Sequence, residues 1–145
     1  MPILAMPGVQ KALTTKLGSS ITVDGVAVAV VANAKPDQPM PYVLIGPASE
    51  RRANTHDAYN AVVIQPIEVY TGGTEAQPFY QCKAIMSSLA NTLDGATLTL
   101  PANSGTFRAC HIPEQVEATC APEGDSMNEV VRGALTLEIT VDILP

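Results

Sequence analysis

Residues 131–143 alternate between apolar and polar side chains. One parity is apolar: Val131, Leu135, Leu137, Ile139, Val141 and Ile143. The other parity carries Arg132, Thr136, Glu138, Thr140 and Asp142. Successive side chains of a β-strand point to opposite faces, so this period of two predicts a long strand with one dry and one wet face. A chain with such a strand must build a sheet and must cover one face of it with apolar groups.

Two segments show the spacing of amphipathic helices. The first runs from Gly8 to Leu17 and stops at Gly18, and its stripe is Val9, Leu13 and Leu17. The second, the main helix, begins with the capping box of residues 74–77 and closes at Asp94–Gly95. Its stripe, in steps of three and four, is Phe79, Cys82, Met86, Leu89 and Leu93. Each helix therefore offers one apolar stripe to a sheet.

The segment Ile21–Val31 reads as a hairpin, because Asp24–Gly25 stands between two apolar runs and suits a two-residue turn. Its second arm has the sequence VAVAVV. One face of that arm would carry Val26, Val28 and Val30, and the other Ala27, Ala29 and Val31. Neither face is polar, so we expect the arm to be buried on both sides or paired with another chain.

Further strands are predicted for Tyr42–Gly46, Ala58–Tyr70, Ala96–Leu100 and Thr106–Thr119, the last broken near Pro113. Residues 33–41 and 122–128 read as connectors, and residues 47–57 as a polar loop or an extended hairpin arm. We expect a bulge or an edge position at Gln65–Pro66, because proline donates no ladder hydrogen bond.

The order of these elements predicts an α+β fold. We expect an antiparallel β-sheet with one main amphipathic helix and a short N-terminal helix packed on one face. The 145 residues suit a single domain, 1–145, and no linker or repeat divides them.

Composition narrows the function. Aromatic residues make up 4% of the chain and there is no Trp, which disfavours a roomy aromatic-lined pocket. The net charge is −6 with eight basic residues, so the footprint of a duplex-binding protein is missing. The one basic pair, Arg51–Arg52, reads as a solvated hairpin tip or as an interface ion pair. The first residues resemble neither a signal peptide nor a membrane span.

The cysteines are Cys82, Cys110 and Cys120. An odd number at irregular spacing is no disulfide framework and suits a reducing cytoplasm. A zinc site built on Cys110, His111 and Cys120 lacks a Cys-x-x-Cys pair and would need Glu114, Glu117 or His56 as its fourth ligand. We therefore expect small buried thiols, no metal and no cofactor.

Enzymatic arrangements are weak in this chain. His56–Asp57 with Ser49 suggests a hydrolase, but no Gly-x-Ser-x-Gly elbow occurs. The stretch Gly72–Thr74 precedes a helix and could bind an anion, yet it lacks the lysine and the spacing of a phosphate loop. We expect no catalytic residues.

The ordered elements resemble the phage tail-completion, or tail-terminator, family. A first helix ends at Leu17, and Pro41–Gly46 (PYVLIG) is similar to the family's Pro-Tyr-Val-x-x-Gly strand. A polar loop, a strand ending in Ile67–Tyr70, a helix like Cys82–Leu93 and a final strand like Arg132–Val141 follow. The resemblance covers most of the chain, and the valine-rich hairpin is more elaborate than the family pattern.

The resemblance implies a structural protein of the virion tail or neck, assembled in the host cytoplasm. Family members form a ring, commonly hexameric, that caps the tail tube and joins it to the head connector. DNA would cross the ring without specific binding, which suits an acidic chain, and no membrane is involved. A cyclic ring needs two different contact surfaces on each subunit. As subunit or tube interface we expect Val26, Val28 and Val30 on one side and Arg51 and Arg52 on the other.

Three alternatives stay open. The chain could be another head–tail connector or a tail-tube subunit, which share small size and ring symmetry. It could be a small hydrolase that uses His56 or the Cys110–His111 region. It could also be a monomeric binding module.

Overall fold

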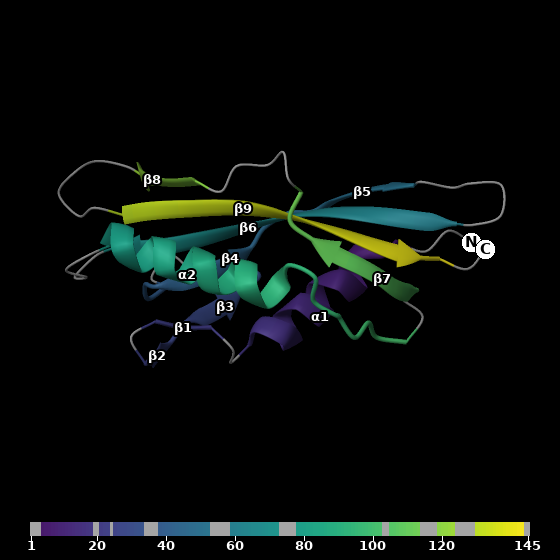
Figure 1. The fold of residues 1–145 in the computed structure, drawn as a ribbon, viewed down its shortest axis with the longest axis horizontal. Helices are drawn as coiled ribbons and strands as arrows, with labels where there is room; N and C mark the ends of the chain where they lie inside the picture. Colours follow the sequence, from purple (N-terminus) through teal and green to yellow (C-terminus); the bar gives the residue numbers. More distant parts are fainter. Residues whose placement is uncertain are drawn as a thin grey trace.

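The structure, a computed structural model, describes residues 4–18, 21–23, 25–33, 38–52, 59–72, 78–102, 105–113, 119–123 and 130–143. Its elements are α1 (Met6–Leu17), β1 (Thr22–Val23), β2 (Val26–Ala27), β3 (Ala29–Val31), β4 (Tyr42–Ile45), β5 (Ser49–Arg52), β6 (Asn60–Gly72), α2 (Pro78–Leu93), β7 (Thr106–His111), β8 (Thr119–Glu123) and β9 (Val130–Asp142). Figure 1 shows the long sheet with α1, α2 and the β1–β2 hairpin on one side of it. The chain is therefore α+β.

Two long antiparallel strands, β6 and β9, form the centre of the main sheet, and they pair without a register shift from Asn60↔Asp142 to Gly72↔Val130. Along the edge that faces away from the other long strand, each of them pairs with two short strands that lie end to end. Strands β5 and β4 pair with successive halves of β6, and β7 and β8 pair with successive halves of β9. The sheet order is β3-β4-β6-β9-β7, with β5 and β8 beside that path.

The predicted alternation of the C-terminal strand is confirmed. Burial along β9 follows a period of two, and the six apolar side chains of the predicted dry face are buried. The central strand β6 adds Ala61, Val63, Ile67 and Val69 to the same face. We call this the inner face of the sheet, and the opposite face the outer face.

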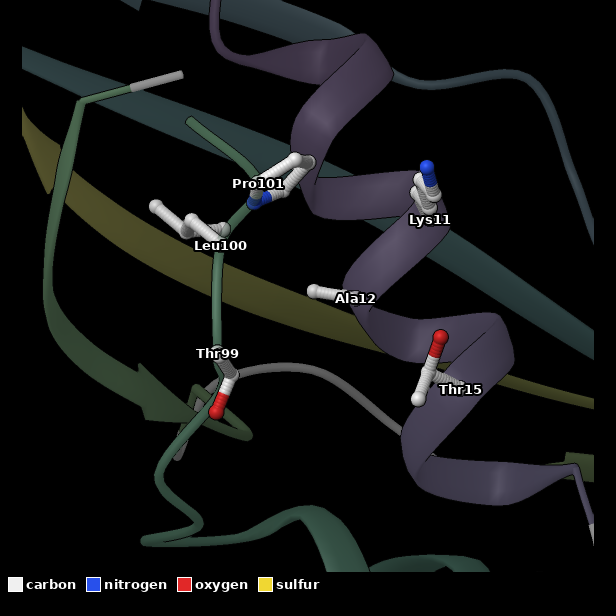
Figure 2. A pocket seen from close by; sticks show the side chains of 6 residues that line it. All are labelled: Lys11, Ala12, Thr15, Thr99, Leu100 and Pro101. Atoms are coloured by element: carbon white, nitrogen blue, oxygen red, sulfur yellow. The ribbon is translucent and has the colours of Figure 1, made fainter. Parts of the chain in front are cut away.

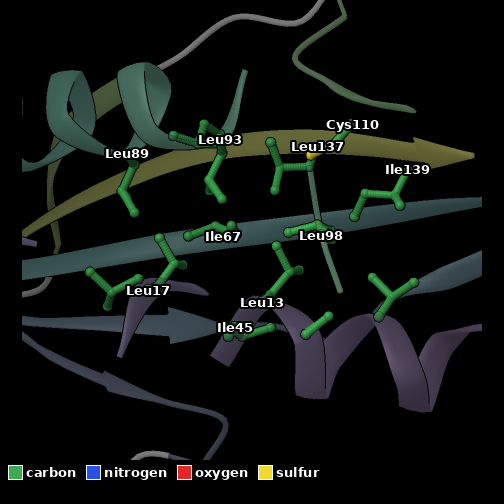
Figure 3. Packing of buried hydrophobic residues seen from close by; sticks show 14 of the residues in the cluster. Leu13, Leu17, Ile45, Ile67, Leu89, Leu93, Leu98, Cys110, Leu137 and Ile139 are labelled. Atoms are coloured by element: carbon green, nitrogen blue, oxygen red, sulfur yellow. The ribbon is translucent and has the colours of Figure 1, made fainter. Parts of the chain in front are cut away.

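Both predicted helices exist, and their stripes cover the inner face. In α1 the buried apolar residues include Val9, Leu13 and Leu17, as expected. The stripe of α2 comprises Cys82, Ile85, Met86, Leu89 and Leu93. Phe79 was expected in it but is 37% exposed on the first turn, whereas Ile85 was missed. Figure 3 shows side chains of α1, α2, β6 and β9 meeting in one core.

The sheet is mixed, so the expectation of a purely antiparallel sheet is wrong. Strand β3 runs parallel to β4, with Ala29 opposite Tyr42. The VAVAVV segment is not one continuous strand, because it is interrupted at Val28. The N–H of Val28 donates to the Ile21 carbonyl at 2.9 Å and closes the β1–β2 hairpin. The chain then enters the main sheet as β3. The proline-rich connector is long enough to return the chain to the same end of the sheet, as a parallel pair requires.

Pro66 lies inside a central strand, and the β6–β9 register shows no bulge there, so that expectation is also wrong. Its position is nevertheless compatible with proline. β5 pairs with β6 up to Ile64 and β4 from Ile67, so Pro66 faces the junction between them. There its carbonyl accepts the Gly46 N–H at 3.0 Å. The missing N–H of Pro66 points toward this junction rather than toward β9, because the N–H and C=O of one residue share a side of an antiparallel strand.

Two further expectations need correction. Residues 96–100 form an irregular segment and no strand. Leu98 is buried in the core, so the alternation of apolar residues there reflects contact with the core alone. Pro122 belongs to strand β8 rather than to a connector. Strand β7 ends at His111, as the predicted break near Pro113 requires. Asp24, the capping box of residues 74–77 and the turn residues 103–104 lie outside the described residues.

Candidate interaction surface

The outer face of the sheet is left uncovered by the described helices, both of which lie on the other side (Figure 1). Strand alternation places on it one parity of β9 and β6, together with their paired neighbours in β3, β4, β5 and β7. Along β9 every outer residue is only partly buried, whereas every inner residue is buried. Such a broad half-buried sheet face is a natural contact surface for another protein.

One end of the outer face carries a polar and aromatic cluster. The rings of Tyr42 and Tyr70 stack with centroids 5.0 Å apart. The Tyr70 hydroxyl donates to Glu68 Oε2 at 2.6 Å, and Arg132 Nη2 donates to Glu68 Oε1 at 2.5 Å. Tyrosine and arginine are enriched in protein interfaces, where they act as anchors.

Electrostatics keep this cluster charged. The hydrogen bond from Arg132 lowers the pKa of Glu68, against an opposing effect of burial, and the bond from Tyr70 lowers it further. In return, Glu68 raises the pKa of Arg132. The pair therefore stays ionised at neutral pH, with its donors and acceptors fixed in one orientation.

The middle of the outer face mixes apolar and polar side chains. Its partly buried apolar residues of outer parity are Leu44, Ile64, Pro66 and Ala134, and the register places Glu138, Thr136 and Glu68 opposite the last three of them. At the far end Arg108 Nε lies 3.1 Å from Asp142 Oδ2, and His111 Nε2 lies 4.0 Å from Glu138 Oε1. These exposed pairs contribute little to stability, since solvent screens them. A mixture of apolar and polar side chains is the ordinary composition of a protein–protein interface.

The predicted arginines lie on strand β5, which we call the arm. Arg51 is exposed on the outer face, opposite Val62 of β6. Arg52 has the other parity, and its Nη2 lies 3.8 Å from Glu50 Oε2. The two arginines therefore serve different faces of the arm, and Arg51 is the one aligned with the outer face.

The predicted valines are distributed over two small strands and the residue between them. Val26 lies in β2, and Val28, between β2 and β3, is 2% exposed within the chain's own core. Val30 of β3 is partly buried against that core. Beside them Ala27 and Ala29 are exposed. Strand β3 is the last strand of the sheet path, so this segment offers a strand edge as well as side chains.

Of the residues considered for chemistry, those that the structure describes do not assemble into a centre. No cluster of three possible metal ligands occurs among the described residues. Burial raises the pKa of the Cys110 thiol to about 11, which keeps it protonated and unreactive at neutral pH. Cys120 lies in β8, whereas His56, Asp57, Glu114 and Glu117 lie outside the described residues. Ser49 is exposed on the arm, and Gly73 and Thr74 also lie outside the described residues.

The cavities found in the described part are small and contain none of these groups. Figure 2 shows one of about 250 Å³ between α1 and residues 99–101, lined by Lys11, Ala12 and Thr15 on the helix side. Another, of about 380 Å³, lies between the first turn of α1 and residues 46–48. Neither is lined by a Cys, His, Asp or Glu side chain.

Sequence reasoning missed Glu68, Tyr70, Arg132 and Glu50. Alternation alone places Glu68 and Tyr70 on one face of a strand, and Arg132 was assigned to the wet face of β9. Their meeting depends on the β6–β9 register, in which Tyr70 lies opposite Arg132. That register joins residues 64 positions apart in the case of Glu68 and Arg132. A local pattern holds no signal for it.

Comparisons with known proteins agree with the fold. One solved structure, described as "Virion of native gene transfer agent (GTA) particle", contains a chain that superposes with a TM-score of 0.74 at 23% identity, covering 95% of this chain and 97% of that one. None of the curated proteins compared with the chain matches it. Neither helix in the described part has both the length and the apolar character of a membrane span.

The family assignment comes from the sequence as a whole. The family model described as "Tail completion protein gp17" matches residues 9–141, which extend from the first helix to the end of the last strand. Family membership makes the chain a structural protein of the virion tail rather than an enzyme, and confirms the resemblance stated above. The chain belongs to the tail completion protein gp17 family.

Proposed function

We propose that this chain is a single tail-terminator-like domain, 1–145, whose copies form a ring that caps the finished tail tube and joins it to the head connector. Six copies are the expected number, and DNA would pass through the ring without specific binding. The observation that carries the proposal is the outer face, which no described helix covers (Figure 1) and whose β9 residues are all only partly buried in the isolated chain. Identical copies that share this surface would complete its burial.

A ring needs two different surfaces on each subunit, and the structure offers two sets of elements. The outer face with Arg51, together with Arg52 on the other side of the arm, is one. The edge formed by β3, which contains Val30, and by the preceding Val26 and Val28 is the other, and it would act mainly through its backbone because Val28 is buried in the core. The tail tube protein and the head connector would meet the two ends of the ring.

The experiment is a mass measurement joined to imaging. Light scattering coupled to gel filtration should give several times the monomer mass, alone or after addition of tail-tube protein, and negative-stain images should show rings. Reversing the charge of Arg51 to Glu should lower the ring fraction while circular dichroism stays unchanged, whereas Arg52 is left in place because its side chain lies 3.8 Å from Glu50. A chain that stays monomeric at high concentration and beside the tube protein would contradict the proposal.

The runner-up function is a head–tail connector or a tail-tube subunit. The similarity to a chain of a gene transfer agent virion particle is equally compatible with either, because a likeness of that degree establishes the fold alone. Adding the chain to growing tubes separates the roles: a terminator stops tube growth and appears at one end, whereas a tube subunit is incorporated along the length.

A further inference from the structure

The arm β5 is weakly held in the sheet for a strand that carries a proposed contact residue. It pairs with β6 on one side only, over four residues, and three of those four are exposed. Its neighbour β4 pairs with the other half of β6 and so gives it no ladder. A short exposed strand of this kind should fray unless a buried group anchors it.

Glu50 is that buried group. Its side chain is 2% exposed although it belongs to an exposed strand, and its parity directs it to the inner face. Oε1 accepts two backbone hydrogen bonds from the start of α1, from Ala5 N at 2.7 Å and from Met6 N at 2.9 Å. Oε2 is buried without a hydrogen-bond partner in the described part and lies 3.8 Å from Arg52 Nη2.

The helix depends on this contact as much as the arm does. The N-cap residue of α1 is Ala5, which offers no capping side chain, and the first turn contains no acidic residue. A helix N-terminus has unpaired amides and a partial positive charge, both of which a carboxylate satisfies. Here that carboxylate comes from a strand 45 residues away. The cavity of about 380 Å³ lies beside this link, between the first turn of α1 and residues 46–48, which precede the arm.

We propose that Glu50 is a positioning residue for assembly: it fastens the arm to the first turn of α1 and thereby presents Arg51 on the outer face. Arg51 follows Glu50 directly, so a fixed inward Glu50 turns Arg51 outward. This inference rests on the proposed function for its assembly role. The coupling between arm and helix stands on the hydrogen bonds alone.

The coupling is tested by amide hydrogen exchange, followed by NMR, in Glu50→Gln. This variant keeps the size of the side chain and removes its charge. The amides of Ala5 and Met6, and the β5 amides that are protected in the wild type, should all exchange at least about tenfold faster, as expected for the loss of a charge-assisted bond. Amides in the Ile67–Tyr70 half of β6 should keep their rates. If Glu50→Gln does not fold, Glu50→Asp, with the charge on a shorter side chain, takes the same measurement.

The matched control is Asp94→Asn. The Asp94 carboxylate also accepts a backbone hydrogen bond, from Ile112 N at 3.0 Å, but it lies at the end of α2. Its substitution should change exchange near Ile112 and leave the arm unaffected. If Glu50→Gln accelerates only Ala5 and Met6 and leaves β5 unchanged, Glu50 is a helix cap only and the coupling is overturned.

The assembly role is tested by the ring fraction of Glu50→Gln, Arg51→Ala and the double variant. Each single variant should lower the ring-forming equilibrium constant about tenfold or more, and the double variant should be no worse than Arg51→Ala, because Glu50 acts through Arg51. Additive losses, or a ring fraction equal to wild type in Glu50→Gln, would overturn the role. If the wild-type chain forms no ring, the proposed function and the assembly role fail together, and the exchange measurement still decides the coupling.

Discussion

At the scale of single residues, Glu68 makes hydrogen bonds that its position in the sequence does not predict. It accepts from Tyr70 and from Arg132 on a face that solvent reaches. Because its pKa is lowered below the ordinary 4.5, the folded state binds its proton more weakly than the unfolded state does. Glu68 therefore stabilises the fold fully above about pH 4.5, and this contribution is lost as pH falls through the lowered pKa.

Replacing Glu68 by Gln should accordingly destabilise the chain by about 1 kcal/mol at neutral pH, a value limited by the solvent exposure of Arg132. The difference from wild type should shrink as the pH falls through the lowered pKa of Glu68, since the wild-type carboxylate is then protonated too. Urea unfolding at several pH values measures both effects. Glu138→Gln is the control, because Glu138 Oε1 lies 4.0 Å from His111 Nε2, a longer contact than those of Glu68, and its effect should be smaller. A pH-independent difference for Glu68→Gln would contradict this account.

At the scale of elements, the packing of α2 on β9 depends on one glycine. A Cβ at Gly133 would lie 2.7 Å from Cys82 Sγ and 3.0 Å from Met86 Sδ. Both sulfur atoms belong to the buried stripe of α2. The helix approaches the strand this closely because Gly133 has no side chain on the inner face.

Gly133→Ala should therefore destabilise the chain by roughly 1–3 kcal/mol through overpacking. Adding Cys82→Ala should recover part of that loss, because it removes the atom nearest to the new methyl group. Thermal or urea unfolding of the two single variants and the double variant gives the interaction between them. Ala134→Gly, the neighbouring site on the outer face, is the control and should show no such interaction with Cys82. Strictly additive changes for Gly133 and Cys82 would show that the clash is relieved elsewhere.

At the scale of the whole molecule, the two faces of the sheet are buried to different extents. The inner face and both helices complete one core, whereas the outer face stays half-buried in the isolated chain. Under the proposed function that second face is completed by neighbouring copies. Stability of the fold and formation of the ring should then respond to different substitutions.

Ala134→Arg tests this separation. Ala134 is a partly buried residue on the outer face, so an arginine there should leave the monomer folded and reduce the ring fraction at least about tenfold. Asn91→Arg, on the exposed side of α2, introduces the same residue away from the sheet and should assemble like wild type. Light scattering measures assembly and circular dichroism the fold. Normal rings from Ala134→Arg would place the subunit contact on another surface.

The elements that could be predicted from the amino-acid sequence are those whose signals are local. The period of two in β9, the stripes of α1 and α2 and the turn at Gly25, where φ is 79°, are each contained within a short window, because side-chain direction repeats over two or about four residues. The wrong prediction for Phe79 has the same origin. Periodicity predicts which face of a helix is buried, but the end of a helix can extend beyond the sheet on which it packs.

Contacts between groups that are distant in the sequence could not be predicted before the fold was known. The parallel entry of β3, the place of Pro66 at the junction of β4 and β5, the Glu68–Arg132 pair and the Glu50 cap of α1 all depend on register and strand order. Those are set by the burial of the whole inner face, which no single segment encodes. For the same reason the candidate surface emerged as a face of the sheet, while the sequence had pointed to separate valines and arginines.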